Sequence, residues 1–126
     1  MKNVKKILLC SLSALLVLSL SGCGKKADES KPLSEVTAEA NKMNVEQLKK
    51  TAMAYKDAIT AKKADVEKLV SKLKDVPVAE MLGKEAAGLK TDIENLNNSV
   101  SALRERFQIY YDKLKEKGGD VSGLSI

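Results

Sequence analysis

The sequence predicts an all-α protein built on an antiparallel two-helix coiled-coil hairpin. Apolar residues recur at alternating spacings of three and four from Val45 to Val76 and again from Leu82 to Leu114. This heptad spacing is typical of coiled coils. Pro77 separates the two runs, and a proline lacks the amide hydrogen that a helix interior requires. No stretch alternates apolar and polar residues in the manner of a β-strand.

The first 22 residues have the pattern of a secretory signal peptide. Three lysines precede an apolar run of 14 residues, Ile7 to Leu20. That run is short of the roughly 20 residues that a membrane-spanning helix needs. The small residues Ser21 and Gly22 follow it, as at a signal cleavage site. We therefore expect cleavage between Gly22 and Cys23.

The stretch Leu20-Ser21-Gly22-Cys23 resembles the lipobox of bacterial lipoproteins. The resemblance implies that Cys23 becomes the first residue and carries a diacylglycerol on its sulfur, with a further acyl chain on the new amino terminus. Two or more acyl chains anchor a protein stably to a membrane. The expected location is the cell envelope. In a Gram-negative host, Gly24 favours the periplasmic face of the outer membrane by the same resemblance.

Residues 23–33 are predicted to be the lipidated cysteine and a flexible tether. The stretch from Gly24 is charged, poor in large apolar residues and contains Pro32, which is the composition of a linker. A helical domain over residues 34–117 is expected to follow. Residues 34–43 form either a separate helical turn or an extension of the first arm, and the sequence leaves both alternatives open.

The first arm of the hairpin is predicted at about 44–75 and the second at about 78–117. Asn44 and Gln47 have the spacing of a capping box, in which each side chain bonds the other's backbone amide. Pro77 suits the first turn of the second arm, and Gly118 suits the position just after its end. The small residues of the tail, 118–126, are expected to be disordered.

A tight turn at Pro77 fixes which residues of the two arms face each other. Residues whose numbers sum to about 155 then lie opposite one another, and each pair joins an a-type to a d-type position, as in Leu73–Leu82, Ile59–Leu96 and Leu48–Phe107. Lys62 is the polar exception in the seam and faces Ile93. It either selects the register, at some cost in stability, or extends its ammonium outward to water. A bundle of several hairpins remains an alternative arrangement.

Composition excludes several classes of function. The chain contains no histidine, so a histidine-based nucleophile triad and a zinc site built on His and Cys are both ruled out. No phosphate-binding glycine loop is present. From Cys23 onward 19 basic residues face 17 acidic ones, a balance that disfavours nucleic-acid binding. We expect no enzyme, no metal, no small-molecule substrate and no cofactor beyond the lipid on Cys23.

Five basic residues are predicted to line one rim of the hairpin: Lys49, Lys56, Lys63, Lys90 and Arg104. The rim is either a solvated face or a binding surface for an anionic envelope polymer or lipid headgroup. Self-association and an envelope protein partner are the other interactions that the pattern allows.

The expected function is that of a non-catalytic envelope lipoprotein, acting as a helical spacer, scaffold or adaptor. The alternatives are a binding module for an anionic polymer or lipid and an accessory subunit that regulates an envelope enzyme or transporter. The lipobox and the heptads are similar to those of murein lipoproteins, but the resemblance goes no further. Those proteins end in a lysine joined to peptidoglycan and form one long helix, whereas this chain ends in Leu124-Ser125-Ile126 and contains Pro77.

Overall fold

A computed structural model describes residues 27–126 of the chain. The described residues form three α-helices, α2 (Leu33–Lys42), α3 (Val45–Asp75) and α4 (Lys84–Glu116), and a short 3-10 turn, η1 (Val78–Glu80), with no strand among them. The prediction of an all-α protein is confirmed. The predicted signal peptide, the cleavage site at Gly22 and the lipidation site at Cys23 lie outside the described residues.

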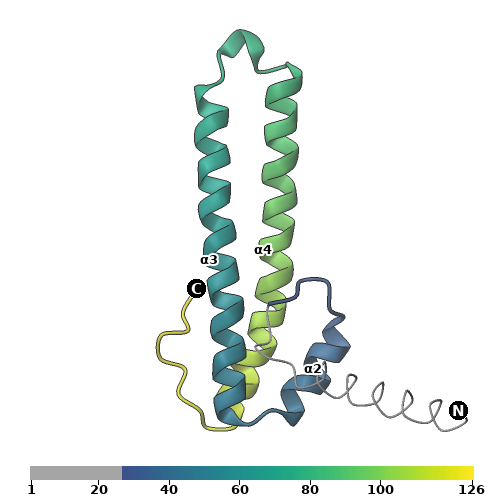
Figure 1. Cartoon of the computed structure of the whole chain (residues 1–126), viewed down its shortest axis with the longest axis vertical. Coiled ribbons are helices and arrows are strands. Elements are labelled where there is room, and N and C mark those ends of the chain that lie inside the picture. The colour runs from purple at the N-terminus through teal and green to yellow at the C-terminus, as the bar shows by residue number, and fades with distance from the viewer. Residues whose placement is uncertain (1–26) are drawn as a thin grey trace, which may run out of the picture.

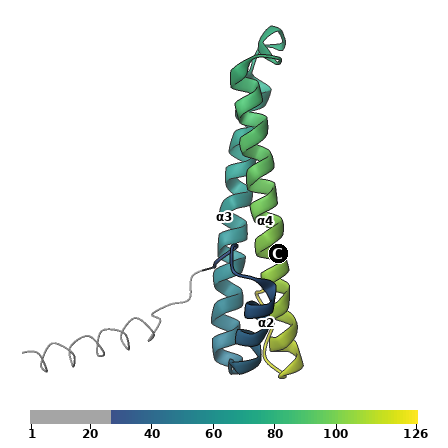
Figure 2. The same ribbon diagram turned by 90° about the vertical axis from the view of Figure 1, so that its right-hand side faces the viewer.

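The molecule is elongated because α3 and α4 lie side by side along most of its length (Figure 1). The chain turns back at one end of this pair, around η1, and we call that end the tip. We call the opposite end the base. There, α2 packs against α4, and the segment after α4 runs back along α3. Figure 2 shows the same arrangement from the side, with α2 confined to the lower part of the pair.

The start of α3 is the capping box that the sequence predicts. The Asn44 side chain accepts a hydrogen bond of 2.8 Å from the Gln47 backbone amide, and the Gln47 side chain accepts one of 3.1 Å from the Asn44 amide. Met43 and Asn44 both have extended backbone conformations. They separate α2 from α3, so residues 33–42 form a helix of their own and do not extend the longer one.

The second long helix begins later than the predicted residue 78. Residues 78–80 form η1, and α4 begins at Lys84 after Gly83, whose amide donates to the Glu80 carbonyl oxygen at 2.8 Å. A Cβ on Gly83 would lie 3.0 Å from that same oxygen. Because residues 78–83 form the turn and not the start of the second helix, Leu82 does not face Leu73 as predicted. Its side chain is 98% exposed at the tip.

Most of the buried apolar side chains gather at the base. They come from α2, from the first half of α3, from the second half of α4 and from the C-terminal segment: Val36, Ala40, Met43, Leu48, Ala52, Tyr55, Ile59, Val100, Leu103, Phe107, Tyr110, Leu114 and Leu124. Toward the tip the heptad positions continue and Ala86 is fully buried, but the larger side chains there are only half-buried, as at Leu69, Leu73, Leu89, Ile93 and Leu96. The core therefore belongs to the half of the molecule in which additional segments cover the two long helices.

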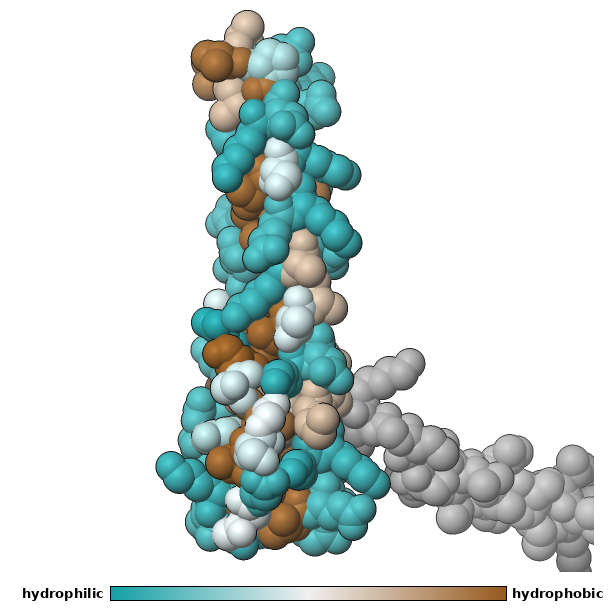
Figure 3. All heavy atoms as spheres, turned by 90° about the vertical axis from the view of Figure 1, so that its left-hand side faces the viewer, coloured by the Kyte–Doolittle hydropathy of each residue, from teal (hydrophilic) through white to brown (hydrophobic). Residues whose placement is uncertain are grey.

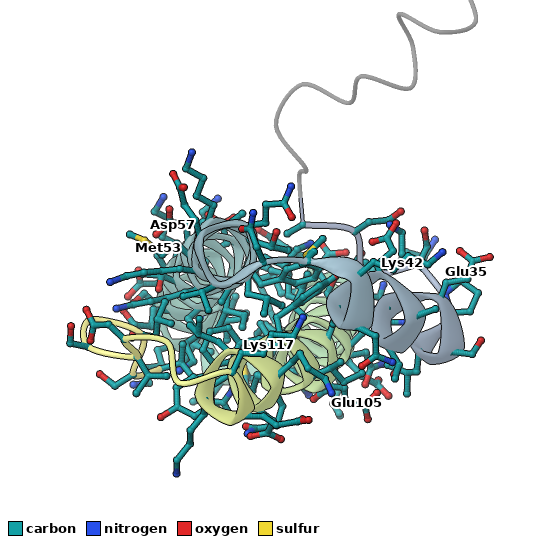
Figure 4. The ribbon with its side chains drawn as sticks, turned by 90° about the horizontal axis from the view of Figure 1, so that it is seen from below. Glu35, Lys42, Met53, Asp57, Glu105 and Lys117 are labelled. Carbon is teal, nitrogen blue, oxygen red and sulfur yellow. The ribbon has the colours of Figure 1, made fainter. Side chains whose placement is uncertain are left out.

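The tail does not match the expected disorder. Gly118, with a φ of 74°, ends α4 in the predicted role, but the residues after it pack on the domain. Leu124 is 1% exposed and belongs to the core. Sequence composition suggested a free tail because its residues are small, but Leu124 is buried in the core and Val121 packs against it. Figure 4 shows this segment and α2 on opposite sides of the α3–α4 pair.

The prediction of a flexible tether over residues 23–33 is wrong for residues 27–33, the part of it that the structure describes. Residues 27–32 lie against α3 and α4, and Leu33 already belongs to α2. Hydrogen bonds to side chains of the long helices hold this segment, which a linker composition does not reveal.

Candidate functional site

The segment 27–32, which we call the N-terminal clasp, is held across the long helices by polar contacts. The Tyr55 hydroxyl accepts from the Asp28 backbone amide and donates to the Asp28 carbonyl oxygen, both at 3.1 Å. Glu29 accepts a hydrogen bond from the Ser99 hydroxyl and lies 3.6 Å from the Lys62 ammonium. The seam lysine thus meets a carboxylate of the clasp, a partner that sequence reasoning did not identify.

A polar cluster lies beneath the clasp at the base. Arg106 is only 8% exposed, and its Nε donates to the Lys31 carbonyl oxygen at 2.9 Å. The Lys31 ammonium bonds the Glu39 carboxylate at 2.9 Å, and the Tyr110 hydroxyl reaches the same carboxylate at 3.3 Å. The contact with Glu39 raises the pKa of Lys31, and burial raises the pKa of Tyr110. Each polar group has its partner, so the cluster joins the clasp, α2 and α4 into one unit.

Sequence reasoning missed this cluster because its members are far apart in the chain. Arg106 follows the heptad residue Leu103 by three positions and resembles any solvated arginine on a helix flank. The one available signal was the tyrosine pair: Tyr55 and Tyr110 both occupy seam positions, and a buried tyrosine needs a partner for its hydroxyl. The rings of the two tyrosines are 5.3 Å apart.

A second contact fixes the lower end of α2. The ammonium of Lys117, labelled in Figure 4, donates to the carbonyl oxygens of Asn41 and Met43. A cation at the carboxyl end of a helix also interacts favourably with the helix dipole. The end of α4 is therefore tied directly to the end of α2.

The five predicted rim residues do not form one continuous basic surface. Lys49 makes a 2.8 Å ion pair with Asp120, and Lys56 donates to the Gly123 carbonyl oxygen. Both lysines thus hold the C-terminal segment on α3. Lys63 is half-buried, while Lys90 and Arg104 are exposed on α4. Two of the five residues have an intramolecular structural role that the sequence did not indicate.

The tip presents apolar surface to solvent. Val78 is 91% exposed and Leu82 98% exposed, the highest fractions among the exposed large apolar side chains. In Figure 3, apolar atoms collect at this end of the molecule and continue below it as a broken stripe between hydrophilic side chains. Beside the tip is a shallow hollow of about 360 Å³, lined by both long helices and the turn: Lys72, Asp75, Val76, Pro77, Glu80, Glu85 and Leu89.

Within residues 27–126, no cluster of three or more metal-ligating side chains is found. None of the helices in that same range combines the length and apolar character needed to cross a membrane.

No protein-family model matches the chain, and no curated protein sequence or solved structure matches it either. The functional argument therefore depends on the residues and contacts described above.

Proposed function

We propose that this protein is a non-catalytic lipoprotein of the bacterial cell envelope, anchored through Cys23, in which the helical domain acts as a spacer and adaptor. The lipobox stretch supports the anchor. The elongated shape, with polar contacts concentrated at the base and apolar surface at the tip, supports a role in which the tip meets a partner away from the anchor. The proposed location is the envelope membrane surface, on the periplasmic side of the outer membrane if the host is Gram-negative.

We further propose that α3 and α4 pair as an antiparallel two-helix coiled-coil hairpin. The predicted a and d residues at the base support this pairing because Leu48, Tyr55, Ile59, Leu103 and Phe107 are all at most 2% exposed. Toward the tip, Ala86 is buried and the larger side chains at heptad positions are half-buried, as expected of a pair of helices without further cover.

The observation that carries the proposal is the position of the clasp relative to the tip. Asp28 is bonded to Tyr55, which precedes the end of α3 at Asp75 by 20 residues. At 1.5 Å per residue, the tip lies about 30 Å beyond the point where the chain enters the domain. Cys23 is five residues before Asp28 and thus within about 18 Å of it. A lipid on Cys23 would hold the base near the bilayer and leave the tip free.

The anionic-ligand alternative has less support. Residues 27–126 carry 17 basic and 17 acidic side chains, so the domain has no net charge with which to attract a polyanion. Lys49 and Lys56 are engaged with the C-terminal segment. The exposed charges that remain of the rim, Lys90 and Arg104, belong to a mixed surface.

Membrane fractionation of two cysteine variants tests the anchor. Cys23→Ala removes the thiol that the lipid requires, and we expect the variant to leave the membrane pellet or to accumulate as an uncleaved precursor. Cys10→Ala is the matched control because Cys10 belongs to the segment predicted to be discarded, and its membrane retention should equal that of the native chain. Mature-sized Cys23→Ala protein retained in the pellet would show that lipidation at this residue is not the anchor.

Site-specific photo-crosslinking from the tip tests the adaptor role. A crosslinker at Val78 or Leu82 should give discrete adducts in intact cells, whereas one at the exposed base residue Lys50 should not. Adducts that form equally from both ends would argue against a tip-directed function.

A further inference from the structure

Two large apolar side chains at the tip lie in water. Val78 is 91% exposed and Leu82 is 98% exposed, and Figure 3 shows apolar atoms gathered at this end of the molecule. Single exposed leucines are common on protein surfaces, but an apolar patch at one end of an elongated domain indicates an interaction site. Burying either side chain against a partner would strengthen binding about tenfold or more.

The turn at the tip keeps these side chains out of the core. The Glu80 amide donates to the Pro77 carbonyl oxygen at 2.8 Å, and the Gly83 amide donates to the Glu80 carbonyl oxygen at 2.8 Å. The proline ring also fixes one backbone angle of the turn. Because the turn is closed by its own hydrogen bonds, Val78 and Leu82 are held in place before any partner binds. Such preorganisation lowers the entropic cost of association.

The hollow beside the tip is acidic. Three carboxylates, from Asp75, Glu80 and Glu85, line it together with one ammonium, from Lys72. All four of these residues are exposed. Within residues 27–126, none of the three carboxylates forms an ion pair. The carboxylates are therefore available to a cationic group from outside the domain.

The other two lysines of this region do not neutralise the hollow. Lys74 and Lys84 are the sequence neighbours of Asp75 and Glu85, and both are exposed, but neither lines the hollow. Consecutive residues of a helix point in different directions, so these ammonium groups serve other faces. A group that enters the hollow meets three negative charges and one positive charge.

Arginine and lysine side chains match this lining. Their apolar stems can pack against Val76, Pro77 and Leu89, which also line the hollow, while their cationic ends bond the carboxylates. The carboxylates repel an anionic lipid surface, and a purely apolar partner would remove them from water without compensation. Charge complementarity therefore favours a basic partner, and the exposed valine and leucine of the same turn favour apolar side chains next to the basic one.

We propose that the tip binds a segment of a partner protein in which arginine or lysine lies beside large apolar residues, as on a basic amphipathic helix. The basic side chain enters the hollow among the carboxylates, and the apolar side chains cover Val78 and Leu82. This inference rests on the proposed adaptor function and gives the chemistry of its partner. The contact is small, as is typical of a transient interaction.

Selection from a random peptide library displayed on phage tests the proposal. The target is the native protein extracted from membranes and placed in nanodiscs of phosphatidylcholine, a lipid without net charge. We expect the selected peptides to be enriched in arginine or lysine next to leucine, isoleucine or phenylalanine. Enrichment of acidic peptides or of apolar peptides without basic residues, or the absence of any enriched sequence, overturns the proposal.

Variants of the tip identify the contact. Combined Glu80→Lys and Glu85→Lys should weaken binding of the selected peptides at least tenfold, and Leu82→Ser about tenfold. Glu105→Lys is the matched control, because this exposed glutamate lies 20 residues further along α4, about 30 Å from Glu85, and binding should not change. The substituted residues are all exposed, so the fold should persist, and circular dichroism checks that it does.

A charge swap in the peptide completes this test. Peptides whose basic residues are replaced by glutamate should bind the variant with Glu80→Lys and Glu85→Lys better than they bind the native tip. Equal affinity of the selected peptides for the native protein and the reversed variant overturns the proposal.

Photo-crosslinking from Ala79 in intact cells separates this proposal from the proposed function. Ala79 is exposed between Val78 and Glu80, so a crosslinker there leaves the apolar and acidic side chains unchanged. We expect protein adducts whose contact peptide carries a basic residue beside apolar ones. A contact peptide without a basic residue, or adducts to phospholipid, overturns the basic-partner proposal alone. Equal adducts from Ala79 and from Lys50 argue against the adaptor function and, with it, this proposal.

Discussion

The C-terminal segment provides the sharpest test of how the base is stabilised. Leu124 is 1% exposed and belongs to the core, whereas Ile126, two residues later, is 45% exposed. The two side chains have the same number of carbon atoms. Truncating each to alanine therefore compares a buried with a half-exposed aliphatic side chain in one short segment.

The expected magnitude for Leu124→Ala follows from its burial. Removing a fully buried leucine side chain costs about 2–5 kcal/mol of unfolding free energy. This position should lie at the low end, about 2 kcal/mol, because a chain end can detach and the loss cannot exceed the free energy of docking the whole segment. Ile126→Ala should cost less than about 1 kcal/mol, since half of that side chain is already in water.

Thermal unfolding followed by circular dichroism measures the difference. For a domain of this size, 1 kcal/mol corresponds to about 4–8 °C in Tm. We expect Tm to fall by about 10 °C for Leu124→Ala and by no more than a few degrees for Ile126→Ala. Equal shifts for the two variants, or no shift for either, would refute the argument that Leu124 closes the core.

Three further predictions concern the backbone and the titratable groups. Gly88 lies in α4, and a Cβ added at this position would meet nothing within 4 Å, so Gly88→Ala should raise the free energy of unfolding by about 0.5–1 kcal/mol in denaturant titrations. Hydrogen bonding to Lys49 lowers the pKa of Asp120. Its stabilising contribution is present above the unfolded pKa near 4 and is lost as the pH falls below it, so native protein and Asp120→Asn should differ in stability at pH 7 and converge in acid. Burial raises the pKa of Tyr110, so the stabilising effect is complete below about pH 10 and is lost above it. Stability should thus fall more steeply above pH 10 in the native protein than in Tyr110→Phe.

The local features of the fold were predictable from sequence where neighbouring residues determine them. The capping box of Asn44 and Gln47 depends on residues three apart, and Gly118 ends α4 by its own backbone freedom. The all-α class followed from the apolar period of the two long helices. In each case, the residues whose interactions determine the structure are close together in the chain.

The features of the fold that the sequence did not predict depend on contacts between residues that are far apart in the chain. The composition of the tail and of the clasp suggested disorder, yet Leu124 joins the core, and Asp28 is bonded to Tyr55, 27 residues away. Leu82 satisfied the heptad pattern but is exposed because a 3-10 turn precedes α4. Periodicity identifies which residues prefer burial, but it does not show which of them the chain can cover.

The candidate site likewise has features that the sequence predicts and features that depend on contacts between distant residues. The basic rim was derived from heptad spacing, which places residues on a helix face but does not show what else reaches that face. Lys49 forms an ion pair with Asp120, and Lys56 donates a hydrogen bond to the Gly123 carbonyl oxygen. The exposed apolar tip and the polar cluster around Arg106 were not foreseen, since each results from the path of the chain around the long helices.

The intact mass of the protein extracted from membranes tests the central claim most directly. Our account predicts a chain that begins at Cys23 and carries the mass of a diacylglycerol on that residue, with or without a further acyl chain on its amino terminus. A chain that retains residues 1–22, or one that begins at Cys23 with an unmodified thiol, would contradict the proposed anchor and the arrangement of base and tip that follows from it.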